Sequence, residues 1–134
     1  MANAKIIVIG CGKLGSSIAK QLCRKGEDVL VIDRDDKKMS NLEDFSGYTL
    51  VGDACDINTL EENGIRNAKH VVIATNDDNT NLFLADVCHY LYGVPNIHVR
   101  LTDSRKAVMC DYESARTICP FDLSMVNFEE HYSN

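Results

Sequence analysis

Short apolar runs alternate with amphipathic stretches along the whole chain. Six of these runs predict strands, at residues 5–10, 28–33, 48–52, 70–74, 96–101 and 115–119. The first run contains four consecutive β-branched residues, at positions 6–9. Continuous apolar runs are typical of strands that are buried on both faces of a parallel sheet, and we expect such burial here.

Amphipathic segments between and after these runs predict helices. In the first of them, at residues 14–25, Leu14, Ile18 and Leu22 share one helical face, and Gly26 follows as a C-cap residue. The segment at residues 79–92 is apolar around most of its circumference, which predicts the most buried helix. The remaining helical segments are residues 36–44, 56–63, 104–111 and 121–130.

The regular alternation of strands and helices determines the expected fold class. It predicts right-handed βαβ units and a parallel sheet with helices on both faces. We therefore expect an α/β fold of the Rossmann type, doubly wound, with six strands in the order 3-2-1-4-5-6. A chain of 134 residues accommodates one such domain, covering residues 1–134.

A glycine-rich loop joins the first predicted strand to the first predicted helix. In a G-x-G-x-x-G motif the first glycine allows a tight turn, the second lets a pyrophosphate approach the backbone, and the third lets the helix pack closely on the sheet. Free amides and the helix dipole then hold the anion. The motif residues are Gly10, Cys11, Gly12, Lys13, Leu14 and Gly15.

Asp33 ends the second predicted strand, where the dinucleotide fingerprint places a carboxylate that accepts hydrogen bonds from ribose hydroxyls. A carboxylate there repels a 2′-phosphate, which favours NAD or ADP and ATP over NADP. The neighbouring Arg34 has two interpretations: it either accommodates a 2′-phosphate or lies over the adenine ring.

The second half of the predicted site follows the third and fourth strands, at the same edge of the sheet. Ala74 is small enough to leave room for a ligand, and Thr75 and Asn76 offer hydrogen bonds to it. Residues 75–77 are also suited to N-cap the next helix, and the two roles are compatible. The full set of residues in this half is Gly52, Asp53, Ala54, Ala74, Thr75 and Asn76.

These signatures together resemble the RCK family, also called KTN or TrkA-N, of nucleotide-binding domains that regulate potassium channels and transporters. The resemblance covers residues 5 to about 120. It rests on the glycine loop, on Asp33, on the segments GDA at residues 52–54 and LEENGI at residues 60–65, and on ATNDD at residues 74–78 followed by Asn81 and Leu82. Arg100, at the end of the fifth strand, is a further matching feature.

The resemblance implies a regulatory domain that binds NAD(H), ATP or ADP. It implies that the loop glycines hold phosphates, that Asp33 holds the adenosine ribose, and that Asp53 and Ala54 flank the adenine. Residues 74–76 would face the rest of the ligand. Arg100 would either neutralise a phosphate or brace the site, unless it is an ordinary surface charge.

Two features depart from the family pattern. ATP-responsive members often carry arginine in the glycine loop where this chain has Lys13, and lysine lacks the planar fork that suits a γ-phosphate. Members usually continue into a C-terminal ligand-binding domain, which we expect to be absent here.

The resemblance also implies partners and a location. We expect a membrane potassium transporter or channel subunit as partner, on the cytoplasmic side of the membrane, and a homodimer or higher ring. The segments at residues 104–111 and 121–130 are the candidate interface surfaces, because the latter is unusually apolar for a final helix.

Composition limits the other partners. The chain carries 14 basic and 20 acidic residues, for a net charge of −6, so it lacks the clustered positive charge that nucleic-acid binding requires. No apolar run approaches the ~18 residues of a membrane span. The six cysteines match no zinc motif, and we expect reduced, mostly buried thiols. Cys11 alone, inside the glycine loop, is a candidate redox sensor.

An NAD-dependent oxidoreductase and a cytosolic sensor of the NADH/NAD ratio are the alternative functions. Hydride transfer needs an acid or base beside the nicotinamide, and no tyrosine is followed by lysine at the Tyr-x-x-x-Lys spacing. The four histidines show no metal-ligand pattern and are expected to be structural or solvated. We therefore expect a binding domain without catalytic activity.

Overall fold

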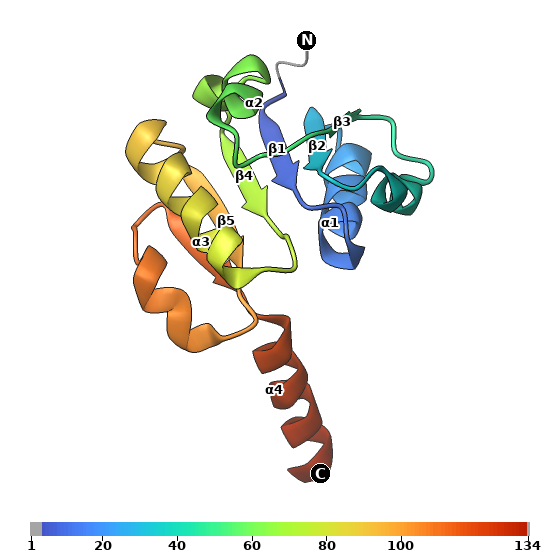
Figure 1. The fold of residues 1–134 in the computed structure, drawn as a ribbon. Coiled ribbons are helices and arrows are strands. Elements are labelled where there is room, and N and C mark those ends of the chain that lie inside the picture. Colours follow the sequence, from blue (N-terminus) through green and yellow to red (C-terminus); the bar gives the residue numbers. More distant parts are fainter. Residues whose placement is uncertain (1–3, 134) are drawn as a thin grey trace.

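The computed structural model describes residues 4–133 and contains one six-stranded sheet (Figure 1). All neighbouring strands are parallel, and their order is β3-β2-β1-β4-β5-β6. The prediction of a doubly wound sheet in the order 3-2-1-4-5-6 is therefore confirmed. The strands are β1 (Ile6–Ile9), β2 (Val29–Asp33), β3 (Tyr48–Val51), β4 (His70–Ile73), β5 (Asn96–Arg100) and β6 (Ala115–Ile118).

Helical segments connect the strands, but not all of them are α-helices. The 3₁₀ segments are η1 (Asp36–Leu42), η2 (Ile65–Asn67) and η4 (Ser104–Cys110). The helical segments predicted at residues 36–44 and 104–111 are therefore present, but as 3₁₀ helices and not as α-helices. A 3₁₀ segment rises about 2.0 Å per residue against 1.5 Å for an α-helix, so it spans a short crossover with fewer residues. The α-helices are α1 (Lys13–Arg24), α2 (Ile57–Glu62), α3 (Asp78–Asp86) and α4 (Pro120–Ser133).

The helix predicted at residues 79–92 divides into two parts. After α3 the chain continues as one π-helical segment, η3 (Val87–Leu91). The wider turn directs Val87 and Cys88 into the core and leaves Leu91 59% exposed. This helix supplies many buried residues, as predicted, but Phe83 on its outer face is 47% exposed.

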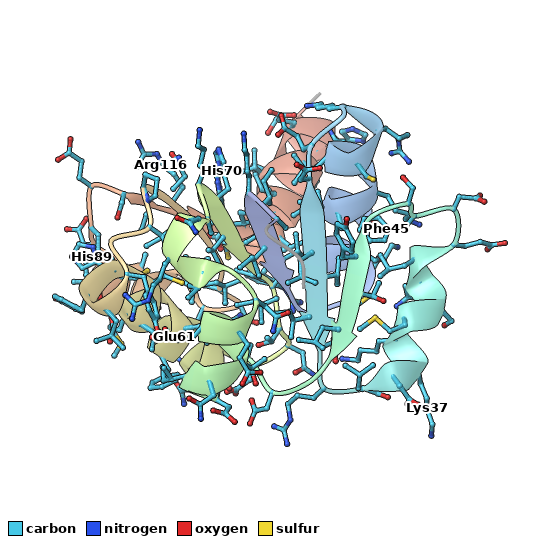
Figure 2. All side chains as sticks on the ribbon, turned by 90° about the horizontal axis from the view of Figure 1, so that it is seen from above. Lys37, Phe45, Glu61, His70, His89 and Arg116 are labelled. Atoms are coloured by element: carbon cyan, nitrogen blue, oxygen red, sulfur yellow. The ribbon has the colours of Figure 1, made fainter. Side chains whose placement is uncertain are left out.

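Two hydrophobic cores lie on opposite faces of the sheet. Ile6 and Val8 pack with α1 and η1 on one face, and Ile7 and Ile9 pack with α2, α3 and η4 on the other. In Figure 2, the side chains of His70 and Arg116 point to one side of the sheet, and Glu61 of α2 lies on the other. The strands therefore carry apolar residues in continuous runs because both of their faces are covered.

The expected burial holds for the central strands but not for the edges. Every residue of β1 is buried, whereas Tyr48 and Val51 of the edge strand β3 are 58% and 52% exposed. The other edge strand, β6, has no fully buried residue. The apolar pattern does not distinguish an edge from a centre, because neighbours on the sheet come from distant parts of the chain.

The last helix, α4, extends away from the sheet (Figure 1). It has no buried residue, although Phe121, Met125 and Phe128 are large and apolar. Neither α4 nor any other helix within residues 4–133 combines the length and hydropathy that a membrane-spanning helix requires.

Candidate functional site

A large cavity lies where the carboxyl ends of the strands meet. Its volume is about 840 Å³, within the range of small-molecule sites. Because all six strands are parallel, the segments that follow them converge at this edge, and the crevice between β1 and β4 marks the reversal of strand order. Residues at or just after the end of each strand line the cavity: Gly10, Asp33, Gly52, Ala74, Arg100 and Pro120.

The structure brings most of the predicted site residues together around this cavity. Every one of them except Cys11 and Gly15 lines it. Cys11 is fully buried, and Gly15 lies beneath the loop against Gly10. The lining residues that the sequence predicted are Gly10, Gly12, Lys13, Leu14, Asp33, Arg34, Gly52, Asp53, Ala54, Ala74, Thr75, Asn76 and Arg100.

The three loop glycines have different structural roles. Gly10 has a φ of +103°, and a Cβ there would lie 2.5 Å from the carbonyl oxygen of Ala74. A Cβ on Gly15 would lie 1.9 Å from the carbonyl oxygen of Gly10, so α1 packs on the end of β1 only without it. A Cβ on Gly12 would meet nothing within 4 Å. Gly12 therefore keeps space open at the cavity, and the other two glycines permit the turn and the helix packing.

The loop presents unpartnered backbone donors at the start of α1. Gly12 is the N-cap residue and supplies no side-chain acceptor to the helix. Within residues 4–133, the amides of Gly12, Lys13 and Leu14 donate no hydrogen bond. Unpaired amides at a helix N-terminus attract anions through their N–H groups and the helix dipole. The loop is thus suited to a phosphate group.

The carboxylate of Asp33 links the second strand to the glycine loop. Its Oδ2 accepts the amide of Cys11 at 2.7 Å, and its Oδ1 accepts the amide of Asp35 at 2.8 Å. An ionised carboxylate has about four acceptor positions, so about two remain for the hydroxyls of a ribose. Asp33 is therefore equipped both to hold the loop in place and to bind a sugar.

We expect Asp33→Asn to weaken NAD binding about 10- to 100-fold, because one amide donor then faces an NH₂ group and the charge-assisted bonds are lost. Isothermal titration calorimetry measures the change. Asp36→Asn, an exposed substitution outside the cavity, is the matched control and should leave the dissociation constant unchanged. Equal affinity in Asp33→Asn and the parent chain would contradict the role of this carboxylate.

The segment after β3 supplies one wall of the cavity. Asp53 lines the cavity while its Oδ1 accepts the amide of Cys55 at 2.9 Å, which closes a tight turn. Ala54 is only 5% exposed and is packed into this wall. Arg34 also lines the cavity and is exposed, so its guanidinium is free to move over a ligand.

The segment after β4 is held from several sides. Asp77 caps α3 by accepting the amide and the hydroxyl of Thr80, which confirms the predicted N-capping role of this segment. Nη1 of Arg100 donates to the carbonyl oxygen of Thr75 at 2.9 Å, so Arg100 braces the site. Its buried Nε has no hydrogen-bond partner in the described part of the chain. An unpaired guanidinium donor in a cavity wall fits an anionic or polar ligand.

Several cavity residues were not predicted. Ser17 lies one turn after Lys13 on α1, and the helical spacing of four residues could have identified it. Lys38, Leu84 and Pro120 carry no local signal of this kind. They reach the cavity through η1, α3 and the start of α4, whose positions depend on the folded sheet.

The environment of Cys11 argues against a reactive thiol. Its side chain is buried and its Sγ donates to the carbonyl oxygen of Lys38 at 3.3 Å. Burial, reinforced by the nearby carboxylate of Asp33, raises the pKa of the Cys11 thiol, and a reactive cysteine needs the thiolate form. All six cysteines are unpaired, as predicted. Only three of them are buried, however, because Cys23, Cys55 and Cys119 lie in partly open positions.

The histidines lie outside the cavity. His70 Nδ1 lies 3.2 Å from His98 Nε2 on the face of the sheet, and His89 stacks on Tyr112. Among the residues that the structure describes, no group of three or more histidine, cysteine or acidic side chains is arranged to hold a metal ion.

Two solved structures with bound nucleotides are similar to this chain. The GsuK channel bound to NAD is 30% identical, with a TM-score of 0.72, over 84% of this chain and 20% of that chain. The Kef CTD of Shewanella denitrificans in its AMP-bound form is 25% identical, with a TM-score of 0.75, over 92% of this chain and 76% of that chain.

Sequence comparison identifies the family. The Trk system potassium uptake protein TrkA of Streptomyces coelicolor is 37% identical over 103 residues, which make up 76% of this chain and 46% of that protein. The chain thus spans about half the length of the curated relatives it matches. The family model of the TrkA-N domain matches residues 6–119. On this evidence the chain belongs to the TrkA-N family.

Proposed function

We propose that the chain is the nucleotide-binding regulatory part of a potassium transport system, with NAD(H) as its ligand and ATP or ADP as alternatives. The observation that carries the proposal is the cavity, in which unpartnered glycine-loop amides and the Asp33 carboxylate occur together. A membrane transporter or channel subunit is the proposed partner, and the cytoplasmic face of the membrane is the proposed location.

The choice of ligand is supported by local chemistry and by the relatives. Asp33 disfavours a 2′-phosphate, and Lys13 provides a point charge where a γ-phosphate is better held by the fork of arginine. GsuK has been solved with NAD and the Kef CTD with AMP. All of these ligands share an adenosine and a 5′-phosphate, which are the parts that Asp33 and the glycine loop suit.

A binding role is favoured over the alternative oxidoreductase by the residues around the cavity. In the described part of the chain, the cavity has no histidine or tyrosine in its lining. Those side chains are frequent acids and bases beside a nicotinamide, so a redox sensor and a transport regulator both fit the site better than a dehydrogenase.

The cavity borders the start of α4, the helix through which a ligand would affect a partner. Pro120, the first residue of α4, lines the cavity, so a ligand in the cavity lies next to the N-terminal end of this exposed helix. A ligand that prefers one orientation of α4 shifts the population toward that orientation. The proposed regulatory step is therefore a change in how α4 docks, with no covalent chemistry.

We expect the purified chain to bind NADH or NAD in a calorimetric titration, with weaker or no binding of NADPH, because Asp33 repels the additional phosphate. ATP, ADP and AMP complete the series. Binding of NADPH alone would reject the assignment of Asp33. Absence of any adenine nucleotide binding would reject the proposed function, and turnover of an alcohol or aldehyde with NAD would favour the enzyme.

We expect a homodimer through α4, because none of the 14 residues of this helix is buried and an isolated helix of that length is marginal in water. Phe121, Met125 and Phe128 are spaced to form one apolar stripe along it. Phe128→Glu should shift light scattering toward the monomer mass, whereas the neighbouring Asn127→Glu adds the same charge without removing an apolar group and should not. A strict monomer in the parent chain at high concentration would contradict the dimer.

A further inference from the structure

Asn81 is a polar side chain that is completely buried beside the cavity. It lies in the first turn of α3, is 0% exposed and does not line the cavity. A buried amide is costly unless its donors and acceptors are paired, so its partners indicate what it does.

The Asn81 amide uses its full hydrogen-bonding capacity on two strand ends. Its Oδ1 accepts the backbone amide of Thr75 at 3.2 Å and also the Thr75 hydroxyl. Its Nδ2 donates to the carbonyl oxygens of Thr75 at 3.1 Å and Arg100 at 2.9 Å. An asparagine side chain offers two donors and two acceptor positions, and all four are used here. Asn81 therefore clamps the ends of β4 and β5 together.

This arrangement changes the role of Thr75. Its amide and its hydroxyl both donate to Asn81, and its carbonyl oxygen accepts from Asn81 and from Nη1 of Arg100. Thr75 has no hydrogen-bond donor left for a ligand. The guanidinium of Arg100 does, because in residues 4–133 its Nε is unpaired and Nη1 makes its one contact to Thr75.

The strand order indicates which part of a ligand meets Arg100. The glycine loop and Asp33 lie at the carboxyl ends of β1 and β2, whereas Thr75 and Arg100 lie at those of β4 and β5, across the point where the order reverses. An adenosine monophosphate bound on the first side does not require the second. A longer nucleotide must extend toward Arg100.

We propose that Asn81 is a positioning residue that holds the Arg100 guanidinium toward the part of a nucleotide beyond its adenosine 5′-phosphate. The inference rests on the proposed function and assigns the two parts of the ligand to different residues: the adenosine 5′-phosphate to the glycine loop and Asp33, and the remainder to Arg100. Asn81 acts through Thr75 and Arg100 and has no contact of its own with the ligand.

Calorimetry on the full chain tests the proposal with NAD, ADP and AMP. Asn81→Ala should weaken NAD binding about tenfold or more and change AMP binding less than about twofold. Asn81→Asp keeps the size and the acceptor for Thr75 but removes the donors to the carbonyl oxygens of Thr75 and Arg100, and it should show the same selective loss. If Asn81→Ala does not fold, Asn81→Asp provides the test. In each variant, unchanged AMP binding shows that the glycine loop and Asp33 are intact.

A double-mutant cycle separates positioning from a general loss of stability. If Asn81 acts through Arg100, combining Asn81→Asp with Arg100→Gln should weaken NAD binding no more than the larger single substitution. Asn96→Ala is the matched control, because Asn96 also belongs to β5 but donates to the carbonyl oxygen of Lys69 at the opposite end of the strand. It should leave NAD binding unchanged.

The outcomes are distinct. A loss shared by NAD and ADP supports a contact to the second phosphate, and a loss confined to NAD supports a contact to the distal nucleoside. Equal losses for NAD and AMP, full affinity for NAD, or additive losses in the double variant would overturn the positioning role. If the parent chain binds none of the three nucleotides, the proposed function itself fails.

Discussion

Gly12→Asp is expected to abolish nucleotide binding while leaving the fold intact or slightly more stable. Gly12 is the N-cap residue of α1, with extended backbone angles of −75° and −164° that any residue adopts, and a Cβ there has no neighbour within 4 Å. Aspartate is a preferred N-cap residue and is a few tenths of a kcal/mol better than glycine. Its carboxylate would accept the free loop amides and repel a phosphate. We expect NAD affinity to fall more than about 100-fold.

Calorimetry and thermal unfolding of the same preparations measure the two opposite effects. Gly12→Ser is the matched variant, because it caps the helix without adding a charge and should lose less affinity than Gly12→Asp. Retained affinity in Gly12→Asp would mean that phosphate does not bind at this helix start. A large loss of stability would mean that the space beside Gly12 is not open.

Gly15→Ala is expected to have the largest effect on stability. A Cβ at this position would lie 1.9 Å from the carbonyl oxygen and 2.9 Å from the carbonyl carbon of Gly10. Both are backbone atoms at the end of a fully buried strand, so α1 would have to move away from the sheet. Overpacking of this kind costs about 3 kcal/mol, which corresponds to a melting temperature lower by roughly 10 °C in a domain of this size.

Urea unfolding of the ligand-free chain measures this change. Gly26→Ala is the matched control at the other end of α1, where φ is +87° and no atom lies within 4 Å of an added Cβ. Its cost should be limited to the left-handed backbone, about 1 kcal/mol. A Gly15→Ala variant that is no less stable than Gly26→Ala would show that the helix and the loop are not in close contact.

The sequence predicted most of the site, because its signals are local. The glycine loop and the residues after β3 and β4 directly follow predicted strands, Asp33 ends one, and parallel strands bring their carboxyl ends to one edge. Arg100 was predicted to neutralise phosphate or to brace the site. The structure shows the bracing role, because Nη1 of Arg100 donates to the carbonyl oxygen of Thr75. A contact between a ligand and the unpaired Nε of Arg100 stays a proposal.

The sequence was less informative about how segments pack against one another. Asn81 was one of the signature residues but had no assigned role, and Thr75 was expected to hydrogen-bond the ligand. The structure shows that these two side chains bond each other. Pro120, which the sequence did not mark as a site residue, lines the cavity.

The sequence by itself determined the strands, their parallel order and the location of the glycine loop, since periodicity, glycine placement and strand-end polarity act over a few residues. Only the tertiary structure decided how exposed the edge strands are, where 3₁₀ turns replace α-helix, and which polar groups remain free for a ligand. Those outcomes depend on contacts such as that of Asn81 with Arg100, 19 residues apart in the chain. A buried donor or acceptor is committed to whichever partner the fold brings within reach, and local pattern does not encode that distance.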